Sequence, residues 1–206
     1  GGTPAKRCGN AATARKADTG KQKNPSVTLN GQTQAINPVN NIIVIEREWL
    51  SGDVVELKLG MDFRFSYWYE NSLGIERGPL VYALRIDEEW REVVNKAYDD
   101  SFWEVLPRSS WNYAVLRSEL DNSKLKIEVR EKMSDNPWNL ENAPITVKIS
   151  GVRIPSWQIE KGSAGRIPVA LTPVRNGDKQ IEEITLIPYG CSTLRISQFP
   201  VINARK

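Results

Sequence analysis

The feature that most constrains the fold is an alternation of apolar and polar residues over positions 55–69. Every odd position in this stretch is apolar or aromatic, whereas the even positions include Glu56, Lys58 and Arg64. Successive side chains of a β-strand point to opposite faces, so a pattern that repeats every two residues predicts β-structure with one buried face. Because the stretch is longer than an ordinary strand, we expect a bulge or bend at Gly60.

Shorter segments with similar patterns follow along the chain. We expect strands at 27–29, 42–46, 80–86, 124–130, 145–149, 184–189 and 194–196, and a type I′ turn at Asn30-Gly31. In the segment 124–130, Leu125, Ile127 and Val129 are predicted to face inward. One short helix is expected near 88–97, because its acidic start suits the helix dipole. Many short strands separated by turn residues predict an all-β chain, an antiparallel β-sandwich with room for a second small β subdomain.

The composition of the chain changes near residue 26. Residues 1–26 contain six Lys or Arg against one Asp and show no periodicity, which predicts an irregular basic stretch. Such a stretch can be an arm for nucleic acid, but its low density of basic residues favours a solvated loop. We assign residues 27–206 to the sandwich, with the region around 88–165 as a candidate insertion or subdomain.

The residue types that are scarce limit the chemistry of the chain. Its 206 residues include no His and only two Cys, Cys8 and Cys191. A Ser-His-Asp relay and a four-thiolate zinc site are therefore excluded, and no metal or cofactor is expected. The acidic residues show no spacing typical of a glycosidase pair or a calcium loop. We expect Cys191 to be a small buried side chain and leave a disulfide with Cys8 open.

Aromatic residues are the strongest candidates for a binding site. The chain has seven tryptophans, and exposed aromatic rings can stack on the apolar face of a sugar or fill a domain interface. Trp68 lies on the polar side of the alternation, so we expect it to meet solvent, another domain or a ligand. Trp111, Tyr113 and Trp138 are further candidates for carbohydrate binding or for a domain interface.

Arg77 is a candidate of a different kind, because it directly precedes Gly78-Pro79. Its guanidinium carries five donors in a rigid fork and can bond several carbonyls at once. Arg77 could therefore attach this corner to a neighbouring loop or domain. The alternative is a solvated arginine at the end of a strand.

Several segments together resemble a known family. They are residues 47–57, 74–84 with Arg77-Gly78-Pro79, 110–113, 151–157, and 185–196 with Pro188-Tyr189-Gly190, followed by Phe199-Pro200. In this order they resemble the C-terminal β-sandwich of glycoside hydrolase family 127, the β-L-arabinofuranosidase family of bacterial type, over about residues 27–200. The Arg-Gly-Pro and Pro-Tyr-Gly segments are the most specific, because several rigid residues recur in a constant order.

The resemblance implies a catalytic (α/α) barrel that precedes the sandwich and holds a zinc-bound cysteine nucleophile with cysteine and glutamate partners. None of these residues maps onto this chain, so no catalytic residue is carried over, and zinc is expected only in the barrel. We therefore expect a non-catalytic accessory domain of a longer glycoside hydrolase that braces the barrel. The alternatives are an independent carbohydrate-binding module for plant polysaccharide and, least favoured, a hydrolase that uses carboxylates alone.

The partners implied by the resemblance are the barrel of the same parent protein and carbohydrate. Nucleic acid is not expected, because the basic residues of 1–26 are sparse. A membrane is not expected either, because the chain lacks an apolar run of about 18 residues. Its start does not resemble a signal peptide. The localisation stays unknown from sequence, with a periplasmic or secreted place favoured because polysaccharide is met there.

Overall fold

The computed structural model describes residues 12–15, 25–39, 42–96, 100–169, 171–175 and 181–205. The chain divides into two compact units, Gly1–Asp62 and Phe63–Lys206. Strands dominate both units, and the helical residues of the described ranges form only three short 3₁₀ turns. The all-β prediction is therefore confirmed. In these ranges no helix has the length and apolar character needed to cross a membrane.

The first unit contains two small sheets. β1 (Ala12–Arg15) pairs antiparallel with β4 (Ile42–Ile45), and β2 (Ser26–Leu29) lies between β3 (Gln32–Gln34) and β5 (Val55–Lys58). Asn30 and Gly31 join β2 to β3 with φ angles of 51° and 79°, and positive φ at both positions is what a type I′ turn requires. The predicted turn is confirmed. Within the stretch predicted to be irregular, 12–15 and 26 belong to strands, and 1–11 and 16–24 lie outside the described residues.

The alternation over 55–69 does not form one bent strand. β5 ends at Lys58 and β6 (Phe63–Tyr67) begins five residues later, in a different sheet and in the other unit. The expected face is covered only in part: Leu57 and Phe63 are more buried than Glu56 and Arg64, but Val55 and Tyr67 on the same face are exposed. A period of two therefore identifies the inward face of a strand but does not say to which sheet the strand belongs.

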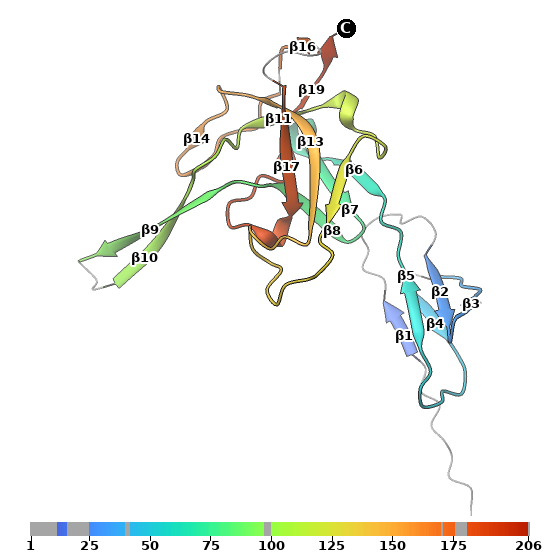
Figure 1. Ribbon diagram of the computed structural model, residues 1–206. Helices are drawn as coiled ribbons and strands as arrows, with labels where there is room; N and C mark the ends of the chain where they lie inside the picture. The colour runs from blue at the N-terminus through green and yellow to red at the C-terminus, as the bar shows by residue number, and fades with distance from the viewer. Residues whose placement is uncertain are drawn as a thin grey trace, which may run out of the picture. The chain divides into compact units, whose positions relative to one another are not determined.

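The second unit is built on a nine-stranded sheet (Figure 1). Besides β6 it contains β7 (Leu73–Arg77), β8 (Leu80–Leu84), β11 (Tyr113–Leu116), β12 (Lys126–Val129), β13 (Ile145–Arg153), β17 (Ile181–Pro188), β18 (Gln198–Phe199) and β19 (Val201–Ile202). The order is β18-β7-β8-β17-β13-β11-β19, with β6 beside β7 and β12 beside β13. All pairs are antiparallel except β11 with β19. β8 pairs with β7 through Leu80 and Val81 and with β17 through Tyr82–Leu84. It thus links two layers, one of β6, β7 and β18 and the other of β17, β13, β12, β11 and β19.

The main core lies between these layers. Its largest fully buried side chains include Leu73, Ile75, Tyr82, Leu186 and Phe199, which come from β7, β8, β17 and β18. Burying each such side chain contributes about 1.5–3 kcal/mol relative to leaving it exposed. A second cluster around Trp157 and Ile202 covers the end of the sheet formed by β11 and β19.

The helix expected near 88–97 is wrong. These residues form β9 (Glu88–Asn95), which pairs with β10 (Asp100–Pro107) over eight residues each and projects from the sheet as a two-stranded ribbon (Figure 1). The segment contains Trp90, Val93 and Val94, residue types that are enriched in strands, and it gains β10 as a partner along its whole length. An acidic first turn is worth only about 0.3–1 kcal/mol, so it cannot outweigh eight cross-strand pairs.

Two further strand predictions need correction. Of the three residues predicted to face inward at 124–130, only Leu125, just before β12, is buried. Ile127 and Val129 are 38% and 63% exposed, because β12 lies at an edge and pairs with β13 alone. The segment 194–196 forms no strand in the structure, although Ile196 accepts a hydrogen bond from the Leu84 amide at 2.8 Å.

The remaining elements are short. β14 (Ile159–Glu160) pairs with β15 (Ser163–Ala164), and β16 (Val174–Arg175) pairs with β20 (Ala204–Arg205). The 3₁₀ turns are η1 (Tyr69–Asn71), η2 (Arg117–Glu119) and η3 (Tyr189–Cys191). Of these turns, η3 matters most for the surface described next, because it follows β17 directly.

Candidate functional site

Trp138 lies in the loop that joins β12 to β13, and this loop is well held. The Trp138 amide donates to Asn136 Oδ1 at 3.2 Å, Arg130 Nε donates to the Ala143 carbonyl at 3.2 Å, and the Cys191 thiol donates to the Pro137 carbonyl at 3.5 Å. A Cβ atom at Gly190 would lie 3.4 Å from Cε3 of Trp138, so the indole rests directly on the backbone of η3. The ring is thus supported from behind while 55% of the residue stays exposed.

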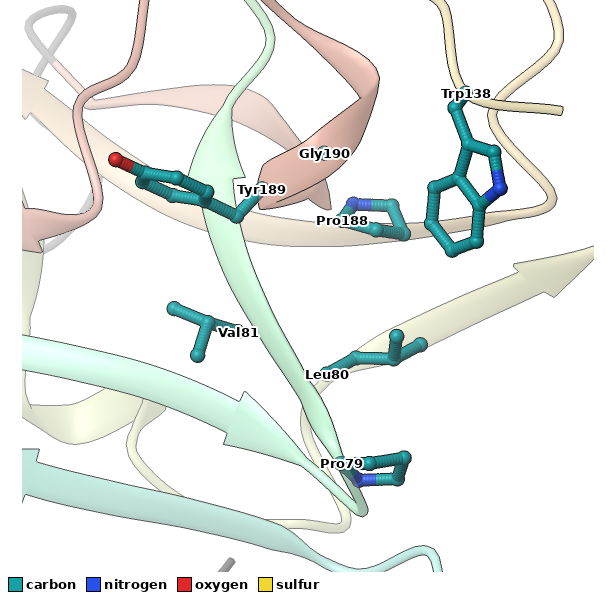
Figure 2. A pocket seen from close by; sticks show the side chains of 7 residues that line it. All are labelled: Pro79, Leu80, Val81, Trp138, Pro188, Tyr189 and Gly190. Atoms are coloured by element: carbon teal, nitrogen blue, oxygen red, sulfur yellow. The ribbon is translucent and has the colours of Figure 1, made fainter.

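One side of Trp138 borders an apolar hollow of about 440 Å³, here called the apolar depression. It is lined by Pro79, Leu80 and Val81 from the corner between β7 and β8, by Pro188, Tyr189 and Gly190, and by Trp138. Figure 2 shows Tyr189 and Trp138 on opposite sides of Pro188, with Leu80 and Val81 on the neighbouring strand. The guanidinium of Arg195 lies 4.6 Å over the Tyr189 ring and supports it by a cation–π contact.

The corner that carries Pro79 and Leu80 is a two-residue hairpin. Arg77 pairs with Leu80, and Gly78 between them has a φ of 57°. The ring of Pro79 holds its own φ near −65°, so the pair has the positive-then-negative sequence of a type II′ turn. The depression is therefore built on a rigid turn at one end and on Pro188 at the other.

The other side of Trp138 borders a hollow of about 300 Å³, here called the polar cleft. It is lined by Glu88 and Trp90 of β9, by Asn139, Leu140 and Glu141 of the Trp138 loop, and by residues 190–193. Two indoles from separate elements therefore face one hollow that also contains carboxylate, amide and hydroxyl groups.

Trp68, the first residue singled out from the sequence, is 58% exposed. Its Nε1 donates to Ser66 Oγ at 2.9 Å, and Ser66 in turn donates to Glu76 Oε1 at 2.7 Å. A Cβ atom at Gly74 would lie 3.1 Å from Trp68 Nε1, so the indole lies over β7. Trp68 lines neither the apolar depression nor the polar cleft.

Trp111 lines a separate hollow of about 450 Å³ that contains Pro107 and Leu194, whereas Tyr113 lies in the interior. Trp111 is half-buried, packs against both apolar clusters and meets Trp157 edge to face at a centroid distance of 5.2 Å. Tyr113 is buried, donates its hydroxyl to Glu182 Oε2 at 3.1 Å, and has its pKa raised by burial. The structure therefore does not bring Trp68, Trp111 and Trp138 together on one face.

Arg77 packs against the core through its guanidinium, which lies 5.9 Å over the Phe63 ring. Among the described residues its buried Nε has no hydrogen-bond partner, and the same holds for the buried hydroxyl of Tyr82. Burial raises the pKa of Tyr82, and the nearby positive charge of Arg77 opposes this shift. The described residues thus provide no carbonyl acceptors for the fork of Arg77, and its attachment to another loop or domain stays a prediction.

Cys191 is buried, as predicted, and has no disulfide partner among the described residues; burial raises the pKa of its thiol. Cys8 lies outside the described residues, so pairing between the two is not tested. The part of the chain that the structure describes contains no group of three or more Asp, Glu, Cys or His side chains placed to hold a metal ion.

Sequence reasoning missed Tyr189, Val81 and Trp90. Tyr189 was considered only as part of a rigid corner, and Val81 only as a strand residue. Trp90 lies in the segment predicted to be a helix, and in the structure it contacts Trp103 of β10 at 6.4 Å between ring centroids. The segment 88–95 shows no clear period of two, so no local pattern marked it as a strand.

Comparison with known proteins gives no match to a family model and none to a curated protein. Among solved structures, one described as a glycoside hydrolase is 19% identical, with a TM-score of 0.54 over 98% of this chain and 29% of that chain. The chain folds like part of a glycoside hydrolase. The resemblance predicted from the sequence is thus confirmed as a likeness of fold.

Two further solved structures are family 127 enzymes. A β-arabinofuranosidase is 18% identical over 95% of this chain and 26% of its own, with a TM-score of 0.46. A β-L-arabinofuranosidase from Geobacillus stearothermophilus T6 is 18% identical over 96% of this chain and 27% of its own, with a TM-score of 0.48. This chain spans less than a third of the length of each of these three proteins.

Proposed function

We propose that this chain is a non-catalytic accessory β-domain of a glycoside hydrolase and that its apolar depression docks against a catalytic (α/α) barrel in the same parent protein. The likeness to part of a glycoside hydrolase supports the domain role. The observation that carries the docking role is the apolar depression itself, where Trp138, Tyr189 and Val81 are all exposed. Apolar patches on protein surfaces commonly mark interaction sites.

The lining of the depression suits a permanent contact. Aromatic residues are enriched in interface cores, and charged residues are depleted there; the depression has no charged lining residue among those described. Its wall is stiff, because Pro79 and Pro188 have restricted backbones and Trp138 rests on Gly190. Binding to a surface that is already ordered loses less conformational entropy, so more of the burial free energy remains for association.

The test compares two valines of the intact parent protein. Val81 lines the depression, and Val129 on β12 is a matched control that is exposed elsewhere. Val81→Asp is expected to lower the thermal midpoint of the barrel by several degrees, because a carboxylate would be buried in an apolar contact. Val129→Asp should leave the midpoint unchanged. A barrel that is equally stable and active after removal of residues 63–206 would refute the docking role.

The alternative, a carbohydrate-binding module based on Trp68, Trp111 and Trp138, has weaker support in that form. Trp111 contacts the two apolar clusters, Trp68 lies over β7, and Trp138 lies on η3. A sugar-binding platform needs several exposed rings that share one surface, and these three do not. A different pair of indoles meets this condition.

A further inference from the structure

The polar cleft brings two exposed tryptophans to one hollow. Trp90 and Trp138 are 53% and 55% exposed, and they come from the β9–β10 ribbon and from the loop between β12 and β13. The volume of about 300 Å³ lies at the lower end of the range for small-molecule sites, about 300–1,000 Å³. A hollow of this size suits one small ring rather than an extended ligand.

Trp90 is held in place by neighbours that leave it exposed to solvent. Its Nε1 donates to Glu88 Oε2 at 3.2 Å, and Trp103 meets it edge to face. The other oxygen of Glu88 accepts from the amides of Thr193 and Leu194 at 2.6 and 3.0 Å, which ties the base of the ribbon to the chain after η3. Glu88 thus acts as a positioning residue, and the Trp90 ring is ordered before any ligand arrives.

The polar groups of the cleft divide into occupied and available ones. The amide of Asn139 is used within its own loop, since it donates to the Asn136 carbonyl and accepts from the Asn142 amide. The Ser192 hydroxyl donates to the Leu194 carbonyl. The Glu141 carboxylate is exposed and has no hydrogen-bond partner among the described residues, because Arg130 bonds only the Glu141 carbonyl. Glu141 is therefore the acceptor that a ligand would meet.

The charge of the cleft limits the ligand. Two of its lining residues, Glu88 and Glu141, are acidic, and none of those described is basic, which disfavours an anionic ligand. A neutral molecule with an apolar face and several hydroxyl donors fits both the indoles and the carboxylate. A cation could also lie against indoles, but both oxygens of Glu88 already accept bonds from Trp90 and two backbone amides, whereas the Ser192 hydroxyl can still accept from a sugar hydroxyl.

We propose that the polar cleft binds one ring of a neutral saccharide chain, with the C–H face of the sugar on Trp138 or Trp90 and a sugar hydroxyl donating to Glu141. The choice of a saccharide rests in part on the proposed function, since a glycoside hydrolase acts where saccharide chains are present. The site itself does not depend on docking of the apolar depression, because Glu141 and Trp90 line the cleft and do not line the depression.

The experiment uses the full chain and isothermal titration calorimetry with linear hexasaccharides of arabinan, galactan, xylan and cellulose. We expect at least one to bind with millimolar or tighter affinity. Trp138→Ala and Trp90→Ala should each weaken that binding at least tenfold, and Glu141→Gln should weaken it severalfold. Trp68→Ala is the matched control, because Trp68 has similar exposure but lies outside the cleft, and it should bind like the wild type.

Several results would overturn the proposal. The first is that no hexasaccharide binds at millimolar concentration. The second is that Trp68→Ala weakens binding as much as Trp138→Ala does, and the third is that choline binds at the same indoles more tightly than any hexasaccharide. Circular dichroism and the thermal midpoint show whether a tryptophan variant is folded, and Glu141→Gln tests the site without removing an aromatic ring. Loss of binding in Val81→Asp with full binding in Glu141→Gln would place the sugar in the apolar depression and also refute the cleft. Docking of a barrel is unaffected by Glu141→Gln, so the two proposals fail separately.

Discussion

Asn112 offers the sharpest test of how this fold is held together. It is buried, and its Nδ2 donates to the carbonyls of Ile154 and Trp157 at 2.9 and 3.0 Å. The backbone carbonyl of Asn112 accepts a hydrogen bond from the Ile154 amide at 2.7 Å. Asn112 therefore joins the start of β11 to the turn after β13, two regions that the sequence analysis noted only as separate segments.

Replacing Asn112 by Ala leaves the buried Trp157 carbonyl without its donor, whereas the Ile154 carbonyl still accepts from the Trp157 amide at 2.9 Å. An unsatisfied buried polar group costs about 1–3 kcal/mol, so we expect Asn112→Ala to lower the free energy of unfolding by about 2 kcal/mol. Asn112→Asp should be destabilised more at neutral pH than in acid. The two carbonyls raise the pKa of the introduced carboxyl in the folded state, so the folded chain binds more protons and loses stability as the pH rises.

The assay is urea unfolding followed by near-ultraviolet circular dichroism of the Trp111–Trp157 pair, which reports on the unit 63–206. With a slope of about 2 kcal/mol per M, the urea midpoint of Asn112→Ala should fall by about 1 M. Asn203→Ala is the control, because Asn203 is exposed and accepts one bond from Arg117 at 3.1 Å. Asn203→Ala should lower the free energy of unfolding by less than about 0.5 kcal/mol. If the two variants have the same midpoint, the amide does not hold these segments together.

Three further predictions concern single residues. Gly78→Ala should cost about 1–2 kcal/mol in thermal unfolding, because Gly78 has a φ of 57°; an unchanged midpoint would contradict this. Cys191 should react slowly with iodoacetamide in the folded chain and quickly in urea, since burial raises its pKa; peptide mass spectrometry separates it from Cys8. Burial raises the pKa of Tyr82 above 10.0, so the unfolded chain releases that proton first and stability falls as the pH rises above about 10. Tyr82→Phe should flatten that fall, and an unaltered pH profile would contradict it.

The candidate site could be predicted only in part. Trp138 is a candidate from sequence because exposed aromatic rings can stack on a sugar or fill an interface, and it does line both hollows. Tyr113 is a candidate from sequence as well, but it is buried, with its hydroxyl on Glu182. The partner of Trp138 in the cleft, Trp90, lies 48 positions away in the sequence. No local pattern reports such a distance, because it depends on the path of the β9–β10 ribbon.

The sequence by itself determined the features that depend on neighbouring residues. Alternation marked the inward face of β5 and β6, and Asn30-Gly31 specified its turn, because strand faces and tight turns follow from local backbone sterics. Only the tertiary structure decided which strands became partners and which faces were covered. It split the 55–69 alternation between two units, made a strand of 88–95 and left Val129 exposed. Strand pairing joins residues far apart in the chain, so the free energy of each pair depends on the whole fold rather than on the segment.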